Sequence, residues 1–406
     1  MNRPPSVDVL ARSIADVGLP HPLLVEAARE AIAAGDPPSA RSRAEEVRQL
    51  LLGPVINATG VLLHTNLGRA PLGPRPAAGY VNLEIDLATG RRGRRAEAVT
   101  RMLAHLTGAE AAIVVNNGAA AVLLALAALA AGSGVAISRG ELVEIGGGFR
   151  IPEVLEVSGA RLVEVGTTNR TRLADYQVQD AALVLKVHQS NYRLVGFTES
   201  VGLRELTTLG LPVVYDIGSG LLDAATPWLD GGPPSWLAGE PAARQSIQEG
   251  ADLVTFSGDK LFGGPQAGIV AGRADLVAAC ARHPLARALR PGSLVLGALQ
   301  ETALAYLRRD GQAIPFWRMA TADVDDLARR AAAIGVGEVV ECASVPGGGA
   351  VPGLEIASVG VAVPGDRTAD LRRGRVPVIA RAQGGRTVCD LRTVDPSDDA
   401  ALAAAL

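Results

Sequence analysis

The sequence predicts an α/β fold built on a mostly parallel sheet that is covered by helices on both faces. From about residue 56 to 291, short apolar runs rich in β-branched residues alternate with glycine-containing turns and helical stretches, a pattern typical of parallel sheets. The 406 residues allow one large domain with smaller ones beside it. A hydrophobic share of 48% is enough for a large core.

The expected elements divide the chain into three parts. Helical stretches at 22–34 and 41–52 predict a small helical domain over residues 1–52. The core over residues 53–310 is expected to end in a helix at 293–309 and to contain seven strands, at 111–115, 134–138, 161–165, 182–187, 212–216, 252–256 and 267–271. Residues 311–406 predict a small α+β domain with helices near 321–334 and 397–405 and strands at 337–341, 354–361, 377–381 and 386–391.

Composition excludes several functional classes. A net charge of −3 gives no general attraction for polyanions, and the 3% aromatic share argues against stacking on single-stranded nucleic acid. The three cysteines are far apart without C-x-x-C spacing, so neither a metal site nor a disulfide framework is expected. The longest apolar run, 119–131, is too short to cross a membrane, and no apolar signal core begins the chain. We expect a soluble, cytoplasmic protein.

Lysine is nearly absent from the chain. Of its 39 basic residues only Lys186 and Lys260 are lysines, and the other 37 are arginines. A guanidinium cannot lose its proton and attack an aldehyde as an amine can, so a retained lysine indicates such chemistry. Lys260 follows an apolar strand and is our candidate for a Schiff base with pyridoxal phosphate (PLP). A solvated loop lysine is the alternative, and Lys186 has no assigned role.

Residues around Lys260 suit the same cofactor. Glycines 258, 263 and 264 allow the backbone to approach a bound ring closely. Ser257 is a candidate ligand of the cofactor phosphate. Asp259 is a candidate for orienting the lysine or assisting proton transfer.

A second candidate for phosphate binding lies earlier in the chain. The strand 111–115 leads into a helix of small residues through Asn117, Gly118 and Ala119. Free N–H groups and the helix dipole make such an amino end an anion site. An ordinary strand-to-helix turn is the alternative interpretation.

Two polar residues follow other predicted strands. Asp216 ends the strand before the lysine-bearing one, where a carboxylate can pair with the ring nitrogen and keep it protonated. His188 follows the strand 182–187, where an imidazole can stack on the ring or position substrate. A turn-forming aspartate and a structural histidine are the alternatives.

Four sequence blocks resemble a known family. They are Ile56-Asn-Ala-Thr-Gly-Val-Leu-Leu-His-Thr-Asn-Leu-Gly-Arg-Ala-Pro-Leu72, Ser138-Arg-Gly-Glu-Leu-Val-Glu-Ile-Gly-Gly147, Glu164-Val-Gly-Thr-Thr-Asn-Arg170 and Phe256-Ser-Gly-Asp-Lys260. These blocks resemble the bacterial selenocysteine synthases, the L-seryl-tRNA(Sec) selenium transferases, and the resemblance extends from about residue 53 to 310 and more loosely to the C-terminus. It implies a fold-type-I PLP-dependent transferase similar to aspartate aminotransferase. Residues 1–52 resemble a shortened tRNA-binding domain of that family.

The resemblance also implies a reaction. Seryl-tRNA(Sec) would displace Lys260 from PLP, and Lys260 is the candidate group for removing the seryl α-proton. Charge would flow into the ring opposite Asp216, and loss of the β-hydroxyl would leave aminoacrylyl-tRNA. Selenophosphate would then supply selenium and give selenocysteinyl-tRNA(Sec).

Three arginines are candidates for holding selenophosphate. Arg287 and Arg290 are spaced i, i+3 on one helix face, and the resemblance makes them the donor-binding pair. Arg69 is a third candidate, from the same or a neighbouring subunit, because the resemblance implies a homo-oligomer, a ring of dimers such as a decamer. A solvated arginine pair is the alternative.

Two arginine clusters are candidates for contacting tRNA phosphates. One is Arg91-Arg-Gly-Arg-Arg95 with Arg101, and the other comprises seven arginines within 367–392. Solvated charged faces are the alternative interpretation of both.

Two other functions stay open. One is a PLP-dependent β-eliminating lyase for a small phosphorylated amino acid or amino-sugar acid, whose arginines would bind the substrate phosphate. The retained segment 1–52 weighs against it. The other is a non-catalytic scaffold or RNA-binding module, against which the Asp216 and Lys260 pair weighs.

Overall fold

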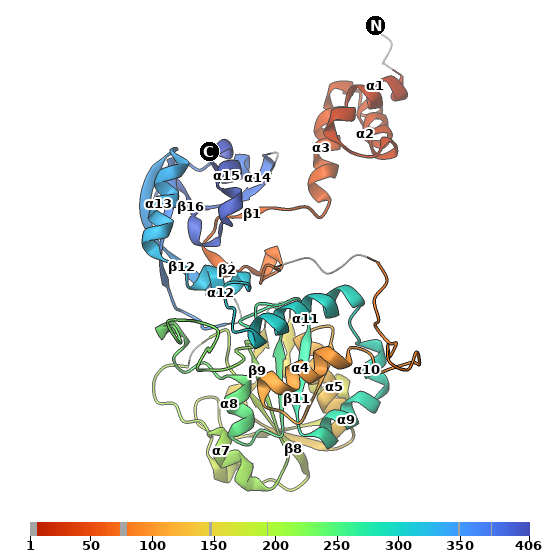
Figure 1. Cartoon of the computed structure of the whole chain (residues 1–406), viewed down its shortest axis with the longest axis vertical. Coiled ribbons are helices and arrows are strands. Elements are labelled where there is room, and N and C mark those ends of the chain that lie inside the picture. The colour runs from red at the N-terminus through yellow and green to blue at the C-terminus, as the bar shows by residue number, and fades with distance from the viewer. Residues whose placement is uncertain (1–5, 74–78, 146–147, 193, 348–349, 375) are drawn as a thin grey trace.

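The computed structural model describes residues 6–73, 79–145, 148–192, 194–347, 350–374 and 376–406. Figure 1 shows a small helical unit at the N-terminus, a large α/β unit, and a smaller α+β unit that contains the C-terminus. Gly146 and Gly147, from one of the four sequence blocks, and Arg375, from the second arginine cluster, lie outside the described residues.

The N-terminal unit consists of α1 (Val7–Ser13), α2 (His21–Ala33) and α3 (Ala40–Leu50). The last two were predicted, whereas α1 is too short to show a clear period. The three helices bury a core of their own, made mostly of alanine and leucine side chains. In Figure 1 this unit stands away from the rest of the chain and is joined to it by an extended connection.

A seven-stranded sheet forms the centre of the large unit. Its strands are β3 (Ala111–Val115), β4 (Gly134–Ser138), β7 (Arg161–Val165), β8 (Ala181–Val187), β9 (Val213–Gly218), β10 (Leu253–Ser257) and β11 (Gly268–Gly272). Their order across the sheet is β3-β11-β10-β9-β8-β4-β7, and only the two pairings of β11 are antiparallel. The predicted α/β class, the mostly parallel sheet and the seven strands are confirmed.

Two separate hydrophobic cores cover the two faces of this sheet. Successive strand residues point to opposite faces, so the neighbours Val213 and Val214 belong to different cores. One core includes residues of α4 (Glu97–Thr107), α8 (Ala243–Gln248) and α11 (Ser293–Leu307). The other includes residues of α5 (Gly118–Ala130), α6 (Ile151–Ser158) and α9 (Ala274–Arg282). Burial on both faces explains why the strands read as continuous apolar runs.

The C-terminal unit contains a five-stranded sheet in the order β15-β16-β13-β12-β2. Its strands are β2 (Val61–Leu63), β12 (Glu338–Gly347), β13 (Ile356–Pro364), β15 (Arg381–Gln383) and β16 (Arg386–Asp390). Helices α13 (Val324–Ile334) and α15 (Asp399–Ala405) share its hydrophobic core. A separate parallel pair joins β1 (Ile56–Asn57) to β14 (Val378–Ile379).

Residues 56–63 pair with strands of another unit than the one in which the sequence placed them. The sequence placed them in the large unit, but β1 pairs with β14 and β2 pairs with β12 of the C-terminal unit. Strands this short show no period, and their partners lie near the other end of the chain. The segment that follows therefore runs from the C-terminal unit into the large one.

The remaining elements are short. They are α7 (Leu203–Leu206), α10 (Pro284–Ala288), α12 (Pro315–Ala320), α14 (Thr368–Arg373), the hairpin of β5 (Glu144–Ile145) and β6 (Phe149–Arg150), and several single-turn 3₁₀ helices. Within the described ranges, no helix has the length and apolar character needed to cross a bilayer.

Candidate active site

The carboxyl ends of β3, β9 and β10 surround a cavity of about 220 Å³. Ligands of open α/β sheets bind at this edge. Eight of the residues predicted from the sequence line it, namely Arg69, Asn117, Gly118, Ala119, Asp216, Ser257, Asp259 and Lys260. Gly218 and Gln266 also line the cavity and were not predicted.

Lys260 and Asp216 are buried ionisable groups in this cavity, 4% and 5% exposed. Burial lowers the pKa of the Lys260 amine, an effect that the nearby Asp216 carboxylate partly opposes. Burial likewise raises the pKa of Asp216, although Thr255 Oγ1 donates a hydrogen bond to Asp216 Oδ1 at 2.8 Å. An amine attacks a carbonyl in its neutral form, so the burial of Lys260 favours the reactive state.

Arg69 and Asp259 form an ion pair at the same cavity, with 2.9 Å between Arg69 Nη1 and Asp259 Oδ2. The backbone N–H of Ala70 also donates to the Asp259 carbonyl at 3.1 Å. Arg69 has a φ of 62°, a conformation that non-glycine residues adopt only when the surrounding contacts impose it. The Asp259 side chain thus orients Arg69, whereas the sequence had suggested that it orients Lys260. Arg69 lines the Lys260 cavity of its own chain.

The amino end of α5 is arranged to bind an anion. Asn117 caps the helix, because its side chain accepts the N–H of Ala120 at 2.8 Å. The N–H groups of Gly118 and Ala119 belong to the first turn, where helices have no partner for them. A Cβ at Gly118 would lie 2.4 Å from Ser257 Oγ, so only glycine lets that hydroxyl reach the helix end.

These groups fit PLP. The helix end and the Ser257 hydroxyl suit its phosphate, the Asp216 carboxylate suits a protonated ring nitrogen, and the Lys260 amine suits its aldehyde. The buried Asp216 carboxylate in particular requires a positively charged partner to offset its loss of solvation.

A Gly118→Ala variant should bind PLP about 10- to 100-fold more weakly, because the new methyl would displace a hydroxyl that donates to a charged phosphate. Titration of the apoprotein with PLP, followed by absorbance, measures this affinity. Gly231→Ala is the matched control, since a Cβ there meets open space. Equal affinities for both variants would remove Ser257 and Gly118 from the phosphate site.

His188 lines a different cavity, of about 630 Å³. Its backbone N–H donates to the Asp216 carbonyl at 2.9 Å, and its Nε2 lies 3.2 Å from Glu240 Oε2. Glu240, whose side chain is only 4% exposed, was missed because nothing in its local sequence marks it. Stacking of His188 on the cofactor ring stays a prediction.

Lys186 has a structural partner. Its Nζ donates to Glu141 Oε1 at 2.9 Å and to the Val201 carbonyl at 3.0 Å. Glu141 Oε2 accepts the N–H of Val187 at 2.9 Å, so this carboxylate is well satisfied. Both charged side chains are largely buried. The ion pair with Glu141 gives Lys186 a structural role, which the sequence had left unassigned.

A Lys186→Met variant should lose about 3 kcal/mol of unfolding free energy, because it leaves the Glu141 carboxylate buried without its counter-charge. Urea denaturation measures the loss. The absorbance of bound PLP should be unchanged. A variant that is as stable as the parent but has lost the PLP band would reverse the roles assigned to the two lysines.

Arg287 and Arg290 are exposed and do not line the Lys260 cavity of their own chain. Arg290 Nη1 lies 3.4 Å from Glu84 Oε1. The carbonyl of Leu289 accepts the N–H of Asn116 at 2.8 Å, which places the end of this helical segment beside the phosphate-binding turn. The two arginines are therefore near the site but face outward.

The two arginine clusters are largely engaged within the chain. Arg92 and Arg95 pair with Glu84. In the second cluster Arg392 is buried and donates to main-chain carbonyls, while Arg386 pairs with Glu338. Arg392 and Arg386 are thus engaged in contacts of the C-terminal unit, and Arg392 belongs neither to a solvated face nor to a free phosphate-binding surface.

The fold and the site together define a fold-type-I PLP-dependent enzyme. A solved structure of D-glucosaminate-6-phosphate ammonia-lyase matches this chain with a TM-score of 0.61 at 23% identity, covering 89% of this chain and 96% of that one. At this identity the match shows the fold alone.

The family follows from sequence. The family model described as SelA, L-seryl-tRNA selenium transferase, matches residues 55–395, so the chain belongs to that family. An L-seryl-tRNA(Sec) selenium transferase of Moorella thermoacetica is 48% identical over 401 residues, covering 90% of this chain and 83% of the relative. One of Geobacter metallireducens is 47% identical over 405 residues, covering 90% and 84%.

Proposed function

We propose that this protein converts L-seryl-tRNA(Sec) to L-selenocysteinyl-tRNA(Sec), with PLP as cofactor and selenophosphate as selenium donor. The observation that carries the proposal is that Lys260 and Asp216, both buried, line one cavity of a chain that belongs to this transferase family. The transferase activity agrees with the names of relatives that are nearly half identical over most of their length.

PLP, when bound, supplies an aldehyde for an amine and an electron sink for charge at the substrate α-carbon. The Asp216 carboxylate would hold a proton on the ring nitrogen. The N–H groups of Gly118 and Ala119 and the Ser257 hydroxyl would hold the phosphate. Lys260 Nζ would take the seryl α-proton and pass a proton to the departing hydroxyl, since burial lowers its pKa and favours the neutral amine that can accept a proton.

Arg69 is the proposed ligand of the selenium donor in this cavity. Its ion pair with Asp259 fixes a guanidinium at the cavity wall, where its N–H groups can donate hydrogen bonds to phosphate oxygens. Arg287 and Arg290 are exposed on their own chain, so a role in donor binding requires that they act across an interface between subunits. We therefore include a homo-oligomer in the proposal.

The N-terminal unit is the proposed tRNA-docking element. Its three helices have a separate core and lie apart from the catalytic unit, which leaves their surface free for a large substrate (Figure 1). Recognition of one tRNA among seryl-tRNAs would depend on shape, since RNA helices conceal their sequence. Activity on charged tRNA places the protein in the cytoplasm.

The deciding experiment is an absorbance titration of the purified PLP-bound protein with seryl-tRNA(Sec) and then seryl-tRNA(Ser), without selenophosphate. A long-wavelength band that shifts only with the first supports the cofactor, the elimination half-reaction and tRNA selectivity together. A band that responds to neither tRNA would retain the PLP site but favour the small-molecule lyase.

A further inference from the structure

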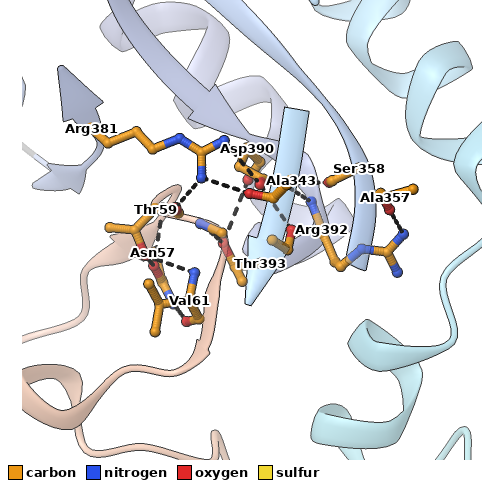
Figure 2. Close-up of polar contacts among 12 residues, drawn as sticks. Asn57, Thr59, Val61, Ala343, Ala357, Ser358, Arg381, Asp390, Arg392 and Thr393 are labelled. Carbon is orange, nitrogen blue, oxygen red and sulfur yellow. Dashed lines mark hydrogen bonds and ion pairs between the residues drawn. The ribbon is translucent and has the colours of Figure 1, made fainter. Parts of the chain in front are cut away.

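The sequence block 56–72 contains a part that the active site does not use. Asn57 and Thr59 lie at a polar cluster of the C-terminal unit, shown in Figure 2, whose centre is Asp390. Gly60 packs against the same cluster. The Asp390 side chain is fully buried and accepts hydrogen bonds from Ser344 Oγ at 2.8 Å and Ser358 Oγ at 2.5 Å. Its backbone N–H donates to the Ala58 carbonyl at 2.9 Å.

Arg381 ties this carboxylate to the block. One of its nitrogens, Nη2, lies 3.5 Å from Asp390 Oδ2. The other, Nη1, donates to the Thr59 carbonyl at 2.9 Å and to the Ala343 carbonyl at 3.0 Å. Figure 2 shows the guanidinium between these groups. A single side chain thus joins β15, β12 and the segment that enters β2.

Gly60 fits against the cluster without spare room. Its φ is 76°, and a Cβ on it would lie 2.2 Å from Asp390 Oδ2. Its N–H donates to Thr393 Oγ1 at 3.0 Å. Asn57 and Thr59 close the turn, because Asn57 Nδ2 donates to the Val61 carbonyl and Thr59 Oγ1 donates to Asn57 Oδ1. The position of the chain entering β2 is therefore determined by the cluster.

The chain between this turn and Arg69 has little freedom. In β2, Val61 and Leu63 are held in register with Val345 and Gly347 of β12. The His64 carbonyl then accepts the N–H groups of both Leu67 and Arg69, each at 3.0 Å. Arg69 also lines a further cavity, of about 280 Å³, together with Asn57, Arg392 and Thr393. The cluster and the active-site arginine thus lie on opposite ends of one constrained segment.

We propose that Arg381 and Asp390 are positioning residues that set the place of Arg69 in the Lys260 cavity. The inference rests on the proposed function, in which Arg69 binds the anionic selenium donor. Buried charge pairs are weak contributors to stability, and apolar residues of similar size often replace them without loss. A pair that fixes one segment of the active site has a reason to be charged, because a directed guanidinium sets a geometry that an apolar contact does not.

The test is a double-mutant cycle on Arg381→Met and Arg69→Met in the full-length PLP-bound protein. Each single variant should raise the KM for selenophosphate about tenfold, while kcat with saturating donor changes less than about twofold. Inorganic phosphate, used as a competitive inhibitor, should bind correspondingly more weakly. In the Arg69→Met background, Arg381→Met should cause no further change in either quantity, because its effect acts through Arg69.

Arg386→Met is the matched control. Arg386 lies in β16 of the same sheet and pairs with the exposed Glu338, whereas the Thr59 carbonyl accepts from Arg381. Its KM for selenophosphate should equal that of the parent. Arg381→Lys covers the case in which the methionine variant does not fold. A lysine has one nitrogen where the guanidinium uses both Nη1 and Nη2, so its geometry cannot be reproduced and its KM should rise also.

The outcomes separate the two proposals. An unchanged KM in Arg69→Met removes the donor-binding role of Arg69, and the positioning role fails with it. Suppose that Arg69→Met raises the KM for selenophosphate as expected, and that Arg381→Met raises it by the same factor again in the double variant. That result overturns the positioning role of Arg381 and leaves the donor-binding role of Arg69 intact. An Arg381 effect on thermal stability without any effect on donor KM has the same consequence.

Discussion

Replacing Lys260 by alanine should abolish the transferase activity, lowering kcat by about 10⁴-fold or more, the upper range for a positioned acid–base group. The variant should also lose the absorbance band of PLP bound to a lysine. Both effects are expected because the amine is 4% exposed in the Lys260 cavity, where burial lowers its pKa and so favours the neutral form that attacks an aldehyde.

Borohydride reduction of the PLP-bound protein, followed by mass analysis of its peptides, measures where the cofactor is attached. The parent protein and Lys186→Met should both carry the label on Lys260, and Lys260→Ala should carry none. Lys260→Arg should behave as Lys260→Ala, since it retains the charge but not the nucleophile. Label on the peptide of Lys186 would contradict the assignment.

An Asp216→Asn variant should have opposite effects on activity and on the stability of the apoprotein. Activity should fall by roughly 10³-fold, because the protonated ring nitrogen of PLP would lose the Asp216 carboxylate as its partner. Loss of one partner of a buried charge pair costs about 3–5 kcal/mol. In the apoprotein the ionised Asp216 carboxylate lowers the free energy of unfolding, since burial raises the pKa of Asp216 above its ordinary value of 3.8. Asparagine removes that destabilisation while keeping an oxygen for the Thr255 hydroxyl.

The pH dependence follows from the direction of this shift. The folded apoprotein binds the Asp216 proton more tightly than the unfolded chain does, so stability falls as pH rises from 3.8 toward the higher pKa of the folded state. At neutral pH the Asp216 proton therefore favours the parent less than it does in acid, and Asp216→Asn should unfold at a higher urea concentration than the parent. Below pH 3.8 the two proteins should be equally stable.

Asp230→Asn is the matched control for this measurement, because Asp230 is exposed and should change the stability little at either pH. If Asp216→Asn is less stable than the parent at neutral pH, the carboxylate is satisfied within the protein and does not require the ring nitrogen. That result would contradict the proposed pairing with PLP.

Much of the site was predictable because its residues follow strands whose apolar runs are visible in the sequence. Lys260, Asp216 and Asn117 each occur just after or at the end of such a run, and carboxyl ends of neighbouring parallel strands meet at one edge. The scarcity of lysine then selected Lys260 as the candidate reactive group, and Lys260 lies buried in the cavity. Glu240 lies in a loop and Glu141 ends a single-turn 3₁₀ helix, Arg139–Glu141. Both were missed because only folding brings them to His188 and Lys186.

By itself the sequence determined the class of the sheet and the order of its strands along the chain, and it indicated a candidate Schiff-base lysine, since these depend on local periodicity and on residue type. Only the tertiary structure decided that residues 56–63 pair with the C-terminal strands and that Arg69 faces Lys260. Those placements depend on the buried cluster at Asp390 and on contacts between residues hundreds of positions apart. Such long-range pairings leave no period in the sequence, because each is fixed by the packing of the whole chain.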